Sequence, residues 1–459
     1  MREPTGPCSA RVGFTHGWIA GIAALLAAGC QEAGPVVAWV DEAFPTVVHV
    51  NWSGGPEGVG VVRWVDPDGH PREVHGNEAV SDHHLSAVGL LPGTAPLLEV
   101  SLDRDGSEDE VGSVTLEIPI APAAIPDAHV QGVLPDGGYV LTHVLTLDRK
   151  DAVVIWDTQG RPAWYHVTVE GQRVLNSLVA GDGTLWFTTN AADYLSTNGY
   201  VHHVSLDGTT HEVWPLDRAY SGAPLPGGGF GYLAKYDAPW KDGTLIWEAI
   251  WEMAPDGSTR EVFDFADWFE PEIFCACCRM EVEATGQVIY DWTHANGLVL
   301  SEDASAWYLM VRHYDALLKI DRASGQLLWV MGGPYGEFSF APPGSEFMHA
   351  HTSTVEDDRL LVMDNGNHRN PPISRAAVYT YDAEARTADL VRFIMEPNGD
   401  LISLLGDVKD LPDGGLLVSW TTKGRIDAYD DTNRLLWRLQ TPLGASTGRA
   451  TWLPSLDAP

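Results

Sequence analysis

The stretch Leu134-Pro135-Asp136-Gly137-Gly138-Tyr139 recurs in similar form as Leu225–Phe230 and Leu411–Leu416. In each copy a short apolar segment reaches a Gly-rich turn, and a second apolar segment follows. Gly and Asp suit such turns because they adopt backbone conformations that most residues avoid. Weaker copies of the turn begin at Ala180, Ser301 and Glu356. The repeated pattern predicts six structural units between residues 127 and 459.

A second turn in every unit contains an aspartate, in most units followed by an aromatic residue. These aspartates are Asp157, Asp207, Asp256, Asp321, Asp382 and Asp430. Neighbouring ones lie 48 to 65 residues apart. A four-stranded propeller blade takes about 40–50 residues, and blades stacked in a ring leave no long exposed strand edge. The period therefore predicts an all-β fold with a six-bladed β-propeller over residues 127–459.

Residues 36–121 show a different pattern, with short alternating apolar segments separated by turns. This spacing favours a small β-sandwich. Leu90–Thr94 resembles a turn of fibronectin type III domains, so we expect a fibronectin III-like β-sandwich ahead of the propeller. Residues 121–126 are rich in Ala and Pro and form the predicted linker.

Residues 1–30 have the pattern of a signal peptide. Two arginines precede the apolar run from Trp18 to Ala28, which is short for a membrane span. The run ends in small residues before Cys30, an arrangement that resembles the bacterial lipobox. We therefore expect an exported protein, periplasmic or an outer-membrane lipoprotein with its lipid anchor at Cys30.

The formal net charge of the 459-residue chain is −35. Phosphate backbones are bound by clustered Lys and Arg, so nucleic acid is not an expected partner. An anionic ligand would need a pocket that is locally positive or rich in hydrogen-bond donors, because the chain as a whole is negatively charged.

Polar residues occupy the positions predicted to face the central channel. In a propeller the first strand of each blade surrounds this channel. Positions six or seven residues before each first turn are His129, Asn176, Ser221, Asn296, His351 and Asp407. His294 shares a strand face with Asn296, and His349 shares one with His351, because each pair is two residues apart. A purely structural core would be apolar at these positions.

Histidines, an asparagine and an arginine near one axis favour an anion site. Arg312, eighteen residues after His294, offers a planar fork of donors that fits sulfate or phosphate oxygens. A neutral imidazole can attack an electron-poor centre, and a protonated one can assist a leaving oxygen. A metal site of His294, His349 and His351 is the main alternative. A cationic arginine opposes metal binding there, so neither a metal nor another cofactor is predicted.

An ordered set of motifs lies between residues 287 and 370. It comprises Asp291–Asn296, Arg312-His313, Leu317–Asp321 with Gly325 and Leu328-Trp329, Gly332-Gly333, Phe347–His351 and Met363–Gly366. This set resembles the bacterial arylsulfotransferase family, the arylsulfate sulfotransferases that use no nucleotide donor. The resemblance implies a periplasmic six-bladed propeller that transfers a sulfuryl group from an aryl sulfate donor to a phenol acceptor.

The resemblance also implies roles for single residues. In the family a histidine is transiently sulfated, and its match here is His351, with His349 as the alternative. His294, Asn296 and Arg312 match residues that bind the sulfuryl oxygens and assist the leaving phenol. The predicted substrate-binding residues are Asn296, His129, Asn176 and Asn365.

One position departs from the family pattern. Family members carry a His-Asp pair near the start of the blade before His294, where this chain has Tyr220-Ser221-Gly222. His129, His202 or His203 could replace that histidine. The departure favours the alternative function, a non-catalytic propeller that binds a ligand or a protein at the outer membrane. A quinone-dependent dehydrogenase is a third interpretation, based on fold alone.

Three cysteines cluster at Cys275-Ala276-Cys277-Cys278, directly before the first family motif. In an exported protein a local disulfide is the expected state, and soft-metal binding is the alternative. The chain lacks the Cys/Ser-x-Pro-x-Arg pattern of the formylglycine sulfatases, so that class of sulfatase is not supported.

Overall fold

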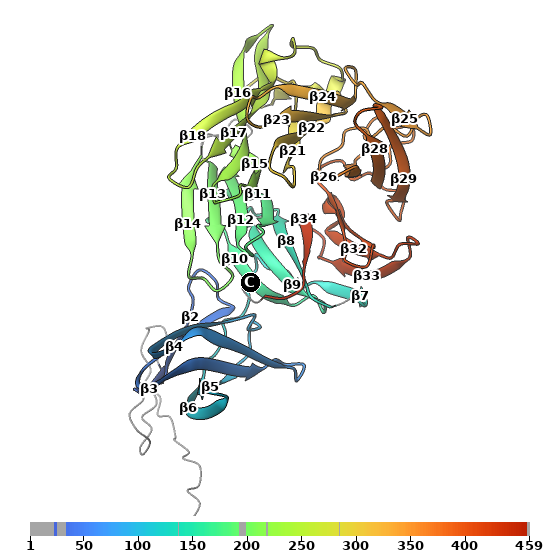
Figure 1. Ribbon diagram of the computed structural model, residues 1–459. Coiled ribbons are helices and arrows are strands. Elements are labelled where there is room, and N and C mark those ends of the chain that lie inside the picture. The colour runs from blue at the N-terminus through green and yellow to red at the C-terminus, as the bar shows by residue number, and fades with distance from the viewer. Residues whose placement is uncertain are drawn as a thin grey trace, which may run out of the picture.

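Two β units follow one another along the chain, an N-terminal sheet and a ring of six smaller sheets (Figure 1). The computed structural model describes residues 23–24, 34–135, 137–191, 199–216, 219–283 and 285–456. Most of the predicted signal peptide, with Cys30, lies outside these residues. Across the described ranges, no helix is long and apolar enough to cross a membrane. Within the described residues there are four short 3-10 helices, which are η1 (Phe265–Asp267), η2 (Ala276–Cys278), η3 (Arg312–Tyr314) and η4 (Thr421–Lys423).

The N-terminal unit is one sheet built around two long strands. Its strands are β1 (Ala23–Ala24), β2 (Val37–Val40), β3 (Val47–Val65), β4 (Pro71–Val88), β5 (Leu97–Arg104) and β6 (Ser107–Thr115). Strand β3 pairs with β2, β4 and β5, and a core of valines, leucines and two tryptophans packs against it. The likeness of this unit to fibronectin type III domains stays a prediction.

The predicted six-bladed propeller is confirmed. From the axis outward, blade 1 holds β34 (Ala445–Leu453), β8 (Tyr139–Thr146), β9 (Ala152–Asp157) and β10 (Pro162–Val167). Blade 2 holds β11 (Gln172–Val179), β12 (Leu185–Ala191), β13 (Gly199–Val204) and β14 (His211–Pro215). Blade 3 holds β15 (Ala219–Pro224), β16 (Phe230–Trp240), β17 (Gly243–Met253) and β18 (Thr259–Asp264).

The second half of the ring repeats this order. Blade 4 holds β21 (Ala295–Leu300), β22 (Ala306–Val311), β23 (Ala316–Asp321) and β24 (Leu327–Gly332). Blade 5 holds β26 (Ser353–Glu356), β27 (Arg359–Asp364), β28 (Arg375–Asp382) and β29 (Thr387–Met395), with β25 (Ser339–Ala341) outside. Blade 6 holds β30 (Asp407–Asp410), β31 (Leu416–Trp420), β32 (Arg425–Tyr429), β33 (Leu435–Gln440) and β7 (His129–Gly132).

The two ends of the propeller sequence close the ring together. Strand β7 forms the outer edge of blade 6, and β34 forms the inner edge of blade 1. The expected channel position of His129 is therefore wrong, since His129 is exposed on an outermost strand. The first repeat begins with β7 at the outer edge of blade 6 and continues with β8, the second strand of blade 1. The innermost place in blade 1 is taken by the C-terminal strand β34, so β34 lines the channel there.

The aromatic residues after the second turns lie on the outer strands of their blades. Trp164, Phe263, Trp329 and Trp437 are buried there, in the cores that join neighbouring sheets. Large rings at a fixed place in each repeat fill the widening space between blades, since burying one contributes roughly 1.5–3 kcal/mol. This packing explains why the repeats hold their spacing.

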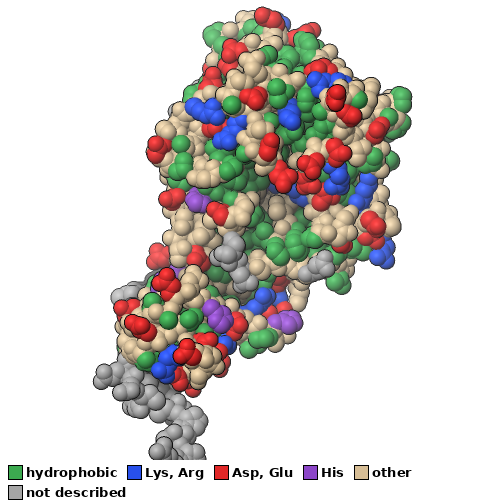
Figure 2. Space-filling view, viewed as in Figure 1, with side chains coloured by type: hydrophobic (Ala, Val, Ile, Leu, Met, Phe, Trp, Pro, Cys, Tyr) green, Lys and Arg blue, Asp and Glu red, His purple; other side chains and the backbone are tan. Residues whose placement is uncertain are grey.

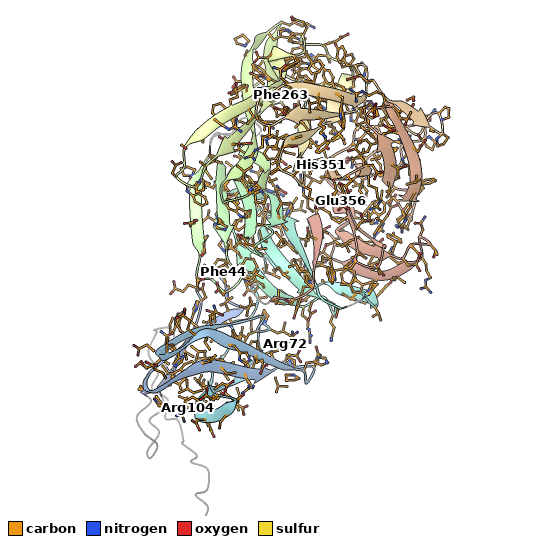
Figure 3. The ribbon with its side chains drawn as sticks, in the orientation of Figure 1. Phe44, Arg72, Arg104, Phe263, His351 and Glu356 are labelled. Atoms are coloured by element: carbon orange, nitrogen blue, oxygen red, sulfur yellow. A yellow bond between two sulfur atoms is a disulfide. The ribbon has the colours of Figure 1, made fainter. Side chains whose placement is uncertain are left out.

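The N-terminal sheet packs on blades 1 and 2. Phe44, labelled at this junction in Figure 3, stacks on Trp164 with ring centroids 5.1 Å apart. The Arg72 guanidinium donates to the Tyr139 hydroxyl over 2.6 Å, and Asp68 pairs with Arg161. A shared apolar core and these polar contacts fix the sheet against the ring.

An insertion between blades 3 and 4 accounts for the longest spacing between repeats. It contains η1, η2 and a hairpin of β19 (Arg279–Val282) and β20 (Gln287–Asp291). Strand β20 runs parallel to β17, which extends the sheet of blade 3. The insertion brings Asp291 to the channel and places Cys275–Cys278 beside it.

Candidate anion-binding site in the channel

Bulges in the inner strands carry polar side chains to the propeller axis. The pairing register shifts between Ala295 and Gly297 in β21, and between Thr447 and Ala450 in β34. A bulge leaves a residue outside the ladder and re-aims its side chain. Asn296 and Arg449 are the residues at these two bulges. The Asn296 carboxamide nitrogen is buried and has no hydrogen-bond partner, so a donor is left for a ligand.

His294 is held by a carboxylate. Its Nδ1 hydrogen-bonds to Asp291 Oδ2, and both residues come from the segment that leads into blade 4. Burial raises the pKa of Asp291, but the charge and hydrogen bond of His294 outweigh burial and lower it below the ordinary range. The dyad thus joins an ionised carboxylate to the His294 imidazole.

The backbone around His294 is strained and braced from blade 3. His294 has a φ of 45°, in the left-handed region that residues other than Gly rarely adopt. Glu248 lies beneath this turn and accepts hydrogen bonds from the Thr293 hydroxyl and from the Ala295 amide at 2.9 Å. Burial and the nearby Asp291 raise the pKa of Glu248. Glu248 therefore positions the turn rather than facing the channel with a free charge.

Arg312 is oriented by its neighbour. His313 Nδ1 donates to the Asp291 carbonyl over 2.6 Å, and its Nε2 accepts from Arg312 Nη1 over 2.9 Å. Burial and the charge of His294 lower the pKa of His313 to about 4, in keeping with this neutral imidazole. Arg312 is buried on η3.

His351 lies inside the ring, directly before β26 (Figure 3). Its pKa is well below the ordinary value, first because of burial and then because of the positive charges of Arg449, His294 and Arg312. Its Nδ1 is buried without a hydrogen-bond partner. His351 is therefore a neutral imidazole among cationic side chains, and a neutral imidazole is chemically able to act as a nucleophile.

Arg449 was not predicted from the sequence. Its Nη2 donates to Ser221 Oγ over 3.2 Å and to the Asn296 carbonyl over 3.4 Å. Arg449 therefore occupies the side of the channel where the family histidine is missing. The sequence does carry one signal for it. Ala445–Leu453 has the pattern of a strand, but no Gly-rich first turn of a repeat follows it.

A cavity of about 790 Å³ opens at the far ends of the inner strands, and Arg449 forms part of its lining. Its walls include Leu178, Val179, Leu298 and Val299, with Lys409 as a second basic residue. Asp182 and Glu302 also line it, so the cavity combines apolar walls with groups of both charges. The outer face of the ring seen in Figure 2 carries acidic and basic side chains side by side.

His349 lies beside the same group, with its ring centroid 5.6 Å from that of His313, but its Nε2 is directed to a cysteine. Its Nε2 lies 4.0 Å from Cys277 Sγ, and its ring lies 4.0 Å from the His368 ring, centroid to centroid. Burial, followed by the charge of Arg312, lowers the pKa of His349 to about 2. The alternative metal site of His294, His349 and His351 is not among the clusters of His, Cys, Asp and Glu whose ligand atoms lie within 4.8 Å of one another in the described ranges.

Four other predicted residues have different surroundings. Asn176 is on inner strand β11, where its amide donates to the Gly222 carbonyl over 2.8 Å and ties blade 2 to blade 3. Asn365 is buried and donates to the backbone at Ile402 and Leu405. His202 and His203, the possible substitutes for the missing histidine, lie on β13, the third strand of blade 2.

The fold and the site together define a class of protein, a β-propeller whose central channel contains guanidinium groups, an unpaired amide and a neutral imidazole. Residues 277–441 match the family model described as arylsulfotransferase (ASST). The resemblance inferred from the motifs is thus confirmed over this part of the chain. A search of the curated proteins gives no match.

Solved structures give only distant similarities. The periplasmic gluconolactonase of Pseudomonas aeruginosa is 11% identical with a TM-score of 0.41, covering 70% of this chain and 100% of that chain. A catalytically inactive variant of virginiamycin B lyase from Staphylococcus aureus is 14% identical with a TM-score of 0.36, covering 69% and 89%. A protein of unknown function from Bacteroides caccae is 13% identical with a TM-score of 0.40, covering 68% and 98%. At this level they carry no argument about the site.

Proposed function

We propose that this protein transfers a sulfuryl group from an aryl sulfate ester to a phenol through a sulfated His351. The observation that carries the proposal is the neutral His351 imidazole flanked by Arg449, Arg312 and His294. The arylsulfotransferase match over residues 277–441 supports the same chemistry. The pKa of His351 is depressed far enough that the imidazole is unprotonated at neutral pH, while the guanidinium groups keep their charge.

In the first step an imidazole nitrogen of His351 attacks the sulfur of the donor. An S–N bond forms as the S–O bond to the aryl group breaks, and the bond electrons leave on the phenolic oxygen. His294, paired with Asp291, gives its proton to that oxygen. Arg312, Arg449 and the unpaired Asn296 amide bind the sulfuryl oxygens.

In the second step the acceptor phenol replaces the donor phenol. His294 removes the proton of the acceptor hydroxyl, whose oxygen attacks the sulfur while the S–N bond to His351 breaks. The electrons of that bond return to the imidazole, and His294 is protonated again. The two steps are mirror images, so one dyad serves as acid and then as base.

We further propose that the protein acts outside the cytoplasm, as a periplasmic or outer-membrane lipoprotein acylated at Cys30. The N-terminal pattern of residues 1–30 supports this location. Intact mass of the mature protein, purified from detergent-extracted membranes, tests it. A diacylglyceryl mass on an N-terminal Cys30 is expected, and an unmodified chain that still contains residues 1–29 contradicts it.

Sulfuryl transfer is tested with 4-nitrophenyl sulfate and a phenol acceptor. We expect acceptor-dependent nitrophenolate release, and a gain of one sulfuryl mass on the protein when the acceptor is left out. His351→Ala abolishes both, whereas His75→Ala, an exposed histidine of the N-terminal sheet, changes neither. Release that survives His351→Ala refutes the nucleophile. Binding of several aryl sulfates without any release favours the non-catalytic binding propeller.

A further inference from the structure

Two cysteine sulfurs and two imidazoles converge beside the channel in a cluster that the proposed sulfuryl transfer does not use. Cys275 and Cys277 come from the insertion of blade 3, around η2. His349 precedes β26, and His368 follows β27 in blade 5. The Sγ atoms and one ring nitrogen of each histidine all lie within 4.8 Å of one another. Segments about 70 to 90 residues apart thus meet at one point with four potential metal ligands.

The spacing within the cluster matches the size of a tetrahedral metal site. Cys277 Sγ lies 3.6 Å from His368 Nε2 and 4.0 Å from His349 Nε2. Zinc bonds of about 2.3 Å to sulfur and about 2.0 Å to nitrogen place tetrahedral ligands roughly 3.3–3.8 Å apart. Only a small movement is needed to bring these ligand atoms to that separation.

The backbone holds His349 in place for such a role. His349 has a φ of 51°, and its amide donates to Asp315 Oδ1 over 2.6 Å. The side chain is buried, its Nε2 faces Cys277, and its Nδ1 has no hydrogen-bond partner. A strained residue with an imidazole aimed at the Cys277 sulfur indicates a functional constraint.

The cluster is accessible on one side. Cys277 and His368 are exposed, whereas His349 is buried at the channel wall. Solvent therefore reaches two of the four ligands, and an ion can enter without passing through the channel. Cys278 is buried beneath the cluster, with its Sγ 2.8 Å from Cys275 Sγ.

The structure has a disulfide between Cys275 and Cys277, so two of the four ligands are joined to each other. We propose that a dithiol reductant opens this pair and that Cys275, Cys277, His349 and His368 then bind one borderline-soft divalent cation, for which Zn²⁺ is the probe. Reduction breaks the S–S bond, forms two thiols and converts the dithiol to its cyclic disulfide. Binding then exchanges the two thiol protons for two metal–sulfur bonds.

This inference goes beyond the proposed function, since no sulfate ester is involved in the binding. An ion held by His349 would lock that ring at the channel wall and leave His351 as the imidazole that faces the sulfuryl group. The site would also cross-link the blade 3 insertion to blade 5. Because only the reduced protein would bind the ion, the amount of bound metal would depend on the redox state of the surroundings.

The test measures zinc binding to the full chain in the His202→Ala background. This substitution removes the other cluster of imidazoles, His166, His202 and His211, whose ligand atoms also lie within 4.8 Å of one another. Protein reduced with dithiothreitol and desalted without oxygen is titrated with Zn²⁺ against a chromophoric chelator. The oxidised protein is titrated in parallel.

We expect one more equivalent of Zn²⁺ in the reduced protein than in the oxidised one, and a thiolate-to-metal charge-transfer band when Co²⁺ replaces Zn²⁺. Cys277→Ser and His368→Ala each weaken binding at least tenfold. His368 is exposed, so its truncation leaves the fold intact, as circular dichroism of the metal-free variant verifies. Equal zinc in both redox states, or unchanged binding by His368→Ala, overturns the proposal whether or not sulfuryl transfer is observed.

Discussion

Replacement of Arg449 tests the channel site most directly. Arg449→Gln keeps a polar side chain at the bulge of β34 but removes the charge and the fork of donors. In the native protein this guanidinium reaches Ser221 and the backbone of Asn296, and its charge lowers the pKa of His351. The substitution therefore affects both the binding of the sulfuryl oxygens and the protonation of the nucleophile.

The size of the effect follows from these two roles. A hydrogen bond to a charged group contributes about 1.5–3 kcal/mol. At about 1.4 kcal/mol per factor of ten, kcat/KM for an aryl sulfate is expected to fall roughly 10- to 150-fold. The pKa of His351 is expected to rise toward its ordinary value. Because only the neutral imidazole attacks, the acid limb of the pH profile moves to higher pH.

The assay is the pH dependence of kcat/KM for 4-nitrophenyl sulfate with a fixed phenol acceptor. Arg449→Lys is the matched variant, since it keeps the charge without the planar fork. We expect its acid limb to stay near that of the native protein while its kcat/KM is intermediate. If Arg449→Gln leaves kcat/KM unchanged, or lowers it without moving the acid limb, the assigned environment of His351 is wrong.

Three further substitutions test the surroundings of the site. Asp291→Asn removes the carboxylate that holds His294, so sulfuryl transfer is expected to slow about 100-fold or more. The loss should be larger for phenyl sulfate than for 4-nitrophenyl sulfate, because phenol is the poorer leaving group and depends more on the acid. An equal loss for both donors contradicts the acid role of His294. Burial raises the pKa of Asp315 to about 6, so this group favours the folded state at low pH and that contribution is lost as the pH rises from about 4 to 6. The difference in denaturant midpoint between native protein and Asp315→Asn should change over that window and not above it. Asp364→Asn leaves the buried Arg375 guanidinium without its charged partner at 2.7 Å. This loss is expected to lower the free energy of unfolding by about 3 kcal/mol. A thermal midpoint within roughly 1–2 °C of the native value would contradict this prediction.

The repeat pattern was enough to predict the propeller, but not how the ring closes. Turn residues such as those at Leu225–Phe230 have local conformational preferences, so they mark blades without knowledge of the fold. Ring closure depends on which strands pair across more than 300 residues. Strand β7 joins the last blade and β34 joins the first, and no local preference reveals either pairing. This is why His129 was placed at the channel and Arg449 was missed.

For the site, too, local motifs could be read from the sequence but long-range contacts could not. His294, Asn296, Arg312 and His351 stand in motifs whose order along the chain could be compared with a family. Asn365 stands in such a motif too, yet it binds backbone carbonyls between blades 5 and 6. A motif preserves the residue and its spacing, whereas the partner of each side chain depends on the packing around it.

By itself the sequence determined the number of blades, the all-β class and the presence of a polar channel, because these depend on turn chemistry and on a repeating period. Only the tertiary structure decided which histidine faces two guanidinium groups and which one faces Cys277. His349 and His351 are two residues apart, so local periodicity gives them the same face. The left-handed φ at His349 breaks that periodicity, and it is held by Asp315 from another blade. Contacts between blades, which no single segment encodes, give these two imidazoles different neighbours.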